Sequence, residues 1–214
     1  KLEKNADLIN NVMFSGRFLK SNIDFLTAHQ GQGQSSFVKK QAALNLLQTI
    51  SSIAAVTAIA KFIKPDSVDY DPRSANFGKI KIGNTRFDIT GGLASLATLA
   101  SRLITQSTKS STTGRVSKLG TGKFGSMTSK DVIYSFLEGK TSPAASVALD
   151  LMQNRDRFTR KPPTVLGEVL NLTAPMPIQN AYELLKDKNS ANVALSIILD
   201  GLGIGTNTYG KAKK

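Results

Sequence analysis

The chain has 214 residues, with 28 Lys and Arg against 15 Asp and Glu, one His, and neither Cys nor Trp. Without Cys it forms no disulfide and no thiolate metal site, and a single His does not build a His-rich metal site. The net charge of +13 favours a polyanionic partner, either nucleic acid or an anionic lipid surface. We therefore expect a protein that is not an enzyme and that holds no metal or cofactor.

The first 63 residues read as helices. Apolar residues recur at three- and four-residue steps to about residue 27, which predicts two short helices that meet near Ser15 and Gly16. Residues 30–36 are rich in Gln, Ser and Gly and predict a loop. Nothing from Phe37 to Ile63 breaks a helix, and Pro65 follows, so one long helix is expected there.

The sequence of this long helix is compatible with two functions. Its 20 consecutive uncharged residues, 41–60, would reach about 30 Å, the thickness of a bilayer core. However, four polar residues fall on one face of it as a stripe: Gln41, Asn45, Gln48 and Ser52. A single polar stripe is typical of a central core helix or an oligomer seam, and that is the prediction. The alternative is membrane insertion, for which Lys39, Lys40, Lys61 and Lys64 would serve as snorkelling anchors.

A β-hairpin is predicted over residues 79–89. Apolar and polar residues alternate on both sides of Gly83 and Asn84, a pair that suits a tight turn. A lone hairpin is marginal in water, so its apolar face should lie on helices, one of which is predicted over residues 89–104. The predicted fold class is mainly α, a multi-helix bundle-like domain with this one short β-hairpin.

Residues 109–130 are predicted to be a basic loop rich in Ser, Thr and Gly, which connects N-terminal residues 1–108 to C-terminal residues 131–214. The two parts could also form one continuous domain. No acidic residue lies between Asp88 and Asp131, whereas six Lys and Arg do. Basic side chains among small hydroxyl residues suit DNA phosphates without base preference, and they suit a solvated loop equally. The candidate DNA-binding residues are Lys109, Arg115, Lys118, Lys123 and Lys130, with a second cluster at Arg155, Arg157, Arg160 and Lys161.

The last third reads as short helices. Thr128 with Asp131, and Ser142 with Pro143, offer the capping groups that start helices. Further helices are expected at about 164–171 and 177–187.

Two other groups of residues are candidates for a catalytic or calcium-binding site. His29 has no nucleophile or carboxylate near it in the sequence, so an enzyme would require the fold to bring carboxylates to it. Asp66, Asp69 and Asp71 lack the Gly and the closing Glu of an EF-hand loop, so they predict a turn whose carboxylates cap the neighbouring backbone.

Several segments resemble a family. The run Asp71-Pro72-Arg73-Ser74, then residues 77–88 (FGKIKIGNTRFD) with Gly91 and Gly92, resembles the large polyvalent protein-associated domain of tailed phages. Shorter segments agree in order: residues 14–19 (FSGRFL), 112–116 (TTGRV), 140–143 (KTSP) and 208–210 (TYG). The likeness covers about residues 12–210, and Gly16 departs from it where Pro would be expected.

The resemblance indicates where the protein is found, and it indicates no chemical mechanism. Proteins of this kind are long phage chains that are packaged in the virion and delivered with the genome, so we expect this chain to be part of a longer one. It implies a structural virion component, an internal or ejection protein near the portal and tail, which self-associates, contacts packaged DNA and reaches the host envelope or cytoplasm. A membrane-inserting conduit and a sequence-independent DNA-binding module are the alternatives. No catalytic residue carries over.

Overall fold

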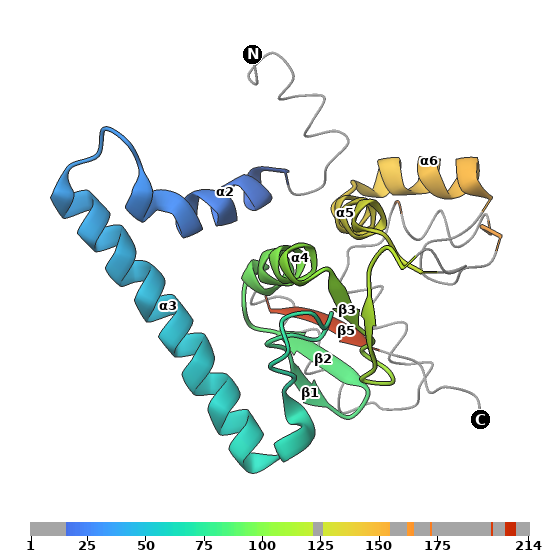
Figure 1. The fold of residues 1–214 in the computed structure, drawn as a ribbon, viewed down its shortest axis with the longest axis horizontal. Coiled ribbons are helices and arrows are strands. Elements are labelled where there is room, and N and C mark those ends of the chain that lie inside the picture. Colours follow the sequence, from blue (N-terminus) through green and yellow to red (C-terminus); the bar gives the residue numbers. More distant parts are fainter. Residues whose placement is uncertain are drawn as a thin grey trace.

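The computed structural model describes residues 16–121, 126–154, 162–164, 172, 198 and 204–208. The predicted class, mainly α with a short hairpin, is confirmed. The helices are α2 (Gly16–Thr27), α3 (Ser36–Ile63), α4 (Leu93–Thr105), α5 (Ser129–Glu138) and α6 (Pro143–Gln153), with short 3-10 turns η2 (Ala28–Gln30) and η3 (Pro65–Ser67). In Figure 1, α2 and α3 form an arm beside a body that holds α4, α5, α6 and the strands.

The predicted hairpin is confirmed, and the end of the chain extends it. Strands β1 (Ile80–Ile82) and β2 (Thr85–Asp88) pair antiparallel around a two-residue turn in which Gly83 has a φ of +60°. Strand β5 (Gly205–Thr208) then pairs with the other edge of β2. Phe87 is only 3% exposed, so this sheet contributes directly to the core. The charged face is also partly covered, since Lys79, Lys81, Arg86 and Asp88 are all half-buried.

The first half of the predicted connecting loop differs from the expectation. Strands β3 (Ser107–Lys109) and β4 (Val116–Lys118) pair antiparallel, and a turn held by the bond from Ser110 N to the Arg115 carbonyl, 2.9 Å long, joins them. Leu119 is 8% exposed and fastens the end of this hairpin to the body. Short runs of Ser, Thr and Val lack a clear apolar period, but β-branched residues suit paired strands, and tertiary contacts decide the outcome.

A carboxylate network ties the second hairpin to the first half of the chain. Asp69 accepts hydrogen bonds from the backbone N–H of Asp71, at 3.0 Å, and from Lys109 Nζ, at 2.9 Å. Asp71 accepts from the backbone N–H of Arg73 and, twice, from its guanidinium at 2.9 and 2.8 Å. The predicted role of these carboxylates in capping the backbone is confirmed, and the ion pairs add a link across some 40 residues of sequence.

Both predicted helix starts in the last third are confirmed. Thr128 and Asp131 form a reciprocal capping box at the start of α5, and Ser142 Oγ accepts from Ala145 N at 3.2 Å at the start of α6. The helices predicted at about 164–171 and 177–187 fall almost wholly outside the described residues, as do Lys123, Arg155, Arg157, Arg160 and Lys161. The division into 1–108 and 131–214 stays a prediction, although α4 packs on α5 across it.

Candidate interface on an exposed apolar helix

Helix α3 is long, apolar and mostly uncovered. Its 28 residues span about 42 Å, and Thr57 is its one buried residue. Phe37, Leu47 and Phe62 are 76%, 60% and 91% exposed. The expectation that α3 is a central core helix is therefore wrong for this chain: the central stretch that is long and apolar enough to cross a membrane, with a mean hydropathy of 1.6, is only 6% buried. Among the described helices, α3 alone meets that test of length and composition.

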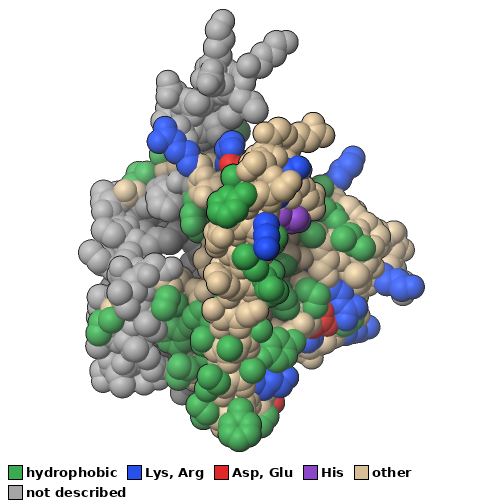
Figure 2. Space-filling model, turned by 90° about the vertical axis from the view of Figure 1, so that its left-hand side faces the viewer, with side chains coloured by type: hydrophobic (Ala, Val, Ile, Leu, Met, Phe, Trp, Pro, Cys, Tyr) green, Lys and Arg blue, Asp and Glu red, His purple; other side chains and the backbone are tan. Residues whose placement is uncertain are grey.

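Apart from the polar stripe, apolar side chains occur on the other sides of α3 rather than on one face. Leu44 and Phe62 lie on the side away from the body, whereas Ile53 lies on the side toward it. A helix with so large an apolar surface is normally buried in a large core or in a membrane. Figure 2 views this side of the molecule, where hydrophobic side chains predominate and acidic ones are few. The described body leaves this surface uncovered.

An apolar hollow of about 730 Å³ separates α3 from the body. Ile50, Ile53 and Thr57 of α3 line one side of it. The opposite side is formed by Leu96 and Leu103 of α4, with further residues from α2. Helix α4 therefore turns its apolar face toward α3 without close packing between the two, which explains why so little of α3 is buried.

The predicted polar stripe faces a second hollow. Gln41, Asn45, Gln48 and Ser52 are all exposed, and Gln41 Nε2 donates to Asn45 Oδ1 at 3.0 Å. Three of the four, with residues 89–91 opposite them, line a more open hollow of about 550 Å³. The structure thus brings the stripe together on one side of α3, but no described protein surface packs on it.

The polar groups of α3 are partly satisfied within the helix. Thr49 Oγ1 donates to the Asn45 carbonyl at 2.9 Å, and Thr57 Oγ1 donates to the Ile53 carbonyl at 2.9 Å. Hydroxyls that bond back to their own helix keep few unmet hydrogen bonds, so these residues are compatible with an apolar environment.

Positive charge marks both ends of α3. Lys39 and Lys40 lie in its first turns and Lys61 and Lys64 at its end, and no acidic residue occurs between Asp24 and Asp66. Lys61 Nζ lies 4.7 Å from the centre of the Tyr70 ring. The sequence analysis missed this tyrosine because residues 61 and 70 lie on opposite sides of the Pro65 turn. The ring attracts the ammonium group through a cation–π interaction, which helps to hold Lys61 at the end of α3.

Four of the predicted DNA-binding residues lie in the part of the chain that the structure describes, and they differ in exposure. Lys109 is half-buried and paired with Asp69, so its charge is already neutralised. Arg115, Lys118 and Lys130 are exposed, the first two at the β3–β4 hairpin and the third on α5. The counter-charge of Lys109 thus comes from Asp69, which lies outside the basic stretch of the sequence.

Among the described residues, the side chain of His29 contacts that of the neighbouring Gln30. Its Nε2 lies 3.1 Å from Gln30 Nε2, in the turn between α2 and α3. Across the part of the chain that the structure describes, no three His, Asp or Glu side chains come together as a metal site. Neither finding tests the expectation that the chain is not an enzyme.

Comparison with known proteins gives no relative: no family model, no curated protein and no solved structure matches this chain.

Proposed function

We propose that this chain is a non-enzymatic structural component of a phage virion, carried inside the particle and ejected with the genome, in which α3 inserts into the host membrane during delivery. The observation that carries the membrane role is the exposure of α3, of which only Thr57 is buried. The placement in a phage rests on the sequence resemblance over residues 71–92.

The free energy gained by burying apolar side chains favours a state in which lipid or protein covers α3. Each large apolar side chain stabilises the protein by about 1.5–3 kcal/mol when it moves from water to an apolar environment. Phe37, Leu47 and Phe62 are only three of the exposed large side chains along this helix. Since hydrophobic burial is the main stabilising term in folding and association, an assembled state that covers them is strongly favoured.

A bilayer suits α3 better than a single helix seam. A two-helix seam covers one narrow stripe, so it would leave the remaining apolar faces of α3 in water. A bilayer covers all faces at once, and the length of about 42 Å exceeds a hydrocarbon core of about 30 Å. The lysines near both ends would then reach the head groups. Self-association of inserted chains, through the polar stripe, would give the walls of a conduit.

Flotation tests this function directly. Purified chain mixed with anionic liposomes should rise with the lipid in a density gradient and remain there after a high-salt wash, because an inserted apolar helix is not held by charge. Release of all protein by salt would indicate adsorption through surface lysines and would overturn the insertion. A chain that stays at the bottom as a soluble oligomer would favour the oligomer seam instead.

We also propose contact with packaged DNA through phosphates. Of the residues predicted to contact DNA, Arg115, Lys118 and Lys130 are described and exposed. The double variant Arg115→Glu with Lys118→Glu should reduce affinity for duplex DNA at low salt and lower the salt dependence of log K by about two, one for each lost phosphate contact. Fluorescence anisotropy at several salt concentrations measures both quantities. An unchanged salt dependence would remove this hairpin from the DNA contact.

A further inference from the structure

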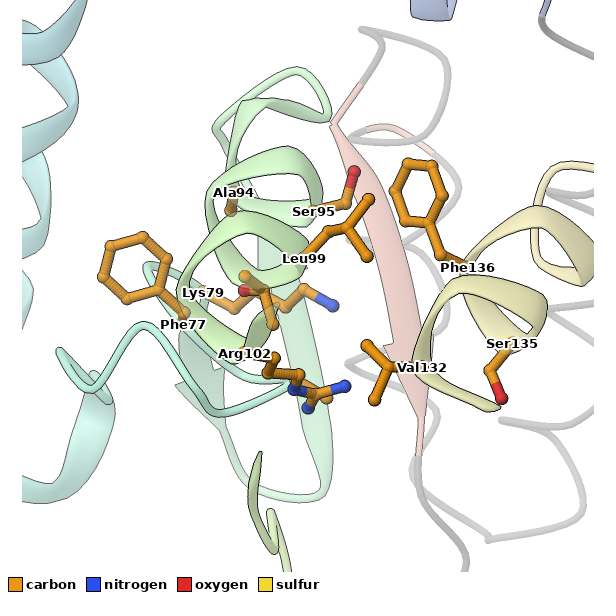
Figure 3. A pocket seen from close by; sticks show the side chains of 11 residues that line it. Phe77, Lys79, Ala94, Ser95, Leu99, Arg102, Val132, Ser135 and Phe136 are labelled. Atoms are coloured by element: carbon orange, nitrogen blue, oxygen red, sulfur yellow. The ribbon is translucent and has the colours of Figure 1, made fainter. Parts of the chain in front are cut away.

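A small pocket lies between α4 and α5, on the body and apart from the α3 surface. Its volume is about 190 Å³, and Leu99 of α4 with Val132 and Phe136 of α5 supply apolar walls (Figure 3). The volume equals that of about six water molecules and falls below the roughly 300 Å³ of a site for a drug-sized ligand. The pocket can therefore hold a small group with a short apolar body.

Two positive side chains reach this pocket, Lys79 from the segment before β1 and Arg102 from the last turn of α4. In Figure 3 both side chains extend toward the α5 side of α4. Arg102 Nε donates to the Arg73 carbonyl at 2.7 Å, which restrains the guanidinium and does not use its two terminal nitrogens. Among the described residues, neither cation forms an ion pair, and no carboxylate lines the pocket.

The hydroxyls around the pocket divide into two kinds. Ser95 Oγ donates to the Gly92 carbonyl at 2.7 Å, and Thr98 Oγ1 donates to the Ser74 carbonyl at 3.4 Å. Their protons are thus already used by the protein. Ser135 on α5 also lines the pocket, but in Figure 3 its hydroxyl points away from Lys79 and Arg102.

The surroundings of Lys79 carry an excess of positive charge. Burial lowers the pKa of Lys79; the negative charge of Asp88 opposes this, whereas the positive charges of Lys140 and Arg86 lower the pKa further. The Asp88 carboxylate is itself engaged, since it accepts from the backbone N–H and the hydroxyl of Thr90 at 2.9 and 2.5 Å. An anion in the pocket would offset the repulsion among these cations.

We propose that this pocket binds a small oxyanion, a phosphate or carboxylate group on a small apolar body, with Lys79 and Arg102 as the cations that hold it. Arginine and lysine pair with the oxygens of such groups through charge-assisted hydrogen bonds. The apolar walls would contact the remainder of the ligand. The proposal does not depend on membrane insertion, because none of these residues belongs to α3.

Titration with three probes at constant ionic strength tests the site: inorganic phosphate, phenyl phosphate and benzoate, followed by the amide resonances of the full chain. We expect saturable shifts for residues that line the pocket, at probe concentrations up to about 10 mM. Tighter binding of phenyl phosphate than of benzoate would assign the site to phosphate esters, and the reverse order to carboxylates. The absence of saturable shifts from all three probes, or shifts confined to residues outside the pocket, would overturn the proposal.

A matched pair of variants distinguishes binding in the pocket from a general effect of net charge. Lys79→Met keeps the length of the side chain and removes its charge, so it should weaken the best probe about tenfold or more. Lys81→Met removes the same charge from β1 at a position that does not line the pocket, and it should leave binding unchanged. Equal binding by wild type and Lys79→Met would contradict the assignment.

Discussion

Replacement of Leu47 and Ala55 together by Asp should abolish the flotation of the chain with liposomes. Both residues are exposed on the side of α3 away from the body, and Leu47 is 60% exposed. A carboxylate near the centre of a membrane-spanning helix costs about 2.5–3.5 kcal/mol, so the pair should lower partitioning by roughly 5 × 10³- to 10⁵-fold. The protein fraction recovered with the lipid, in a density gradient, measures this loss.

The control carries the same two negative charges elsewhere. Ser111→Asp with Thr112→Asp alters two exposed residues in the turn between β3 and β4. This variant should float like the wild type, because the bilayer does not need to cover that turn. The account of α3 fails if both double variants lose flotation to the same extent, since net charge alone would then explain the result.

Replacement of Lys109 by Glu should destabilise the fold more than any other single charge reversal considered above. Lys109 Nζ lies 2.9 Å from Asp69 Oδ1 and 3.9 Å from Asp71 Oδ2, and the three side chains are 19–26% exposed. The variant would place three carboxylates together where two now share a cation. The cost should be about 2–4 kcal/mol of unfolding free energy, between the values for exposed and buried pairs. Urea unfolding followed by circular dichroism measures it.

Lys118→Glu is the matched control, because it makes the same charge change on the paired strand. Lys118 is exposed, and its register partner is Ser107. Its unfolding free energy should change by less than about 0.5 kcal/mol, while its DNA affinity falls. Equal loss of stability in the two variants would show that Lys109 is not part of a specific network.

The same network should make the unfolding free energy decrease at acidic pH. Hydrogen bonds from the Arg73 guanidinium lower the pKa of Asp71 from 3.8 to about 2. Burial raises the pKa of Asp69, but the hydrogen bond from Lys109 and those from its neighbours outweigh burial and lower it overall. Because both folded-state pKa values are depressed, their stabilisation is present above about pH 4 and is lost as the pH falls toward 2. Asp71→Asn should flatten this decline, whereas Asp66→Asn, at an exposed position in η3, should not.

Local patterns predicted much of the described fold. The alternation around Gly83 and Asn84 placed the β1–β2 hairpin, and capping residues placed the starts of α5 and α6. These features are decided within a few residues of sequence, by turn geometry and by the hydrogen bonds of the first helical turn. The range of α3 followed in the same way from an uninterrupted helix-forming run ended before Pro65.

Distant contacts were not predictable in this way. The pairing of β2 with β5 joins residues more than 100 positions apart, and the ion pair between Asp69 and Lys109 crosses 40 positions. The polar stripe of α3 was visible, but whether the chain would cover the helix was not, because that depends on how closely α4 approaches it. For the same reason the convergence of Lys79 and Arg102 on one pocket gave no signal in the sequence.

The depth of α3 in a bilayer is the quantity that tests the central claim most directly. The chain contains no Trp, so Leu47→Trp places a single fluorophore near the middle of α3. With liposomes that carry bromine at defined depths on their acyl chains, the emission should shift to the blue and be quenched most strongly by the deepest bromines. An emission spectrum unchanged from that in buffer, with no quenching at any depth, would contradict insertion.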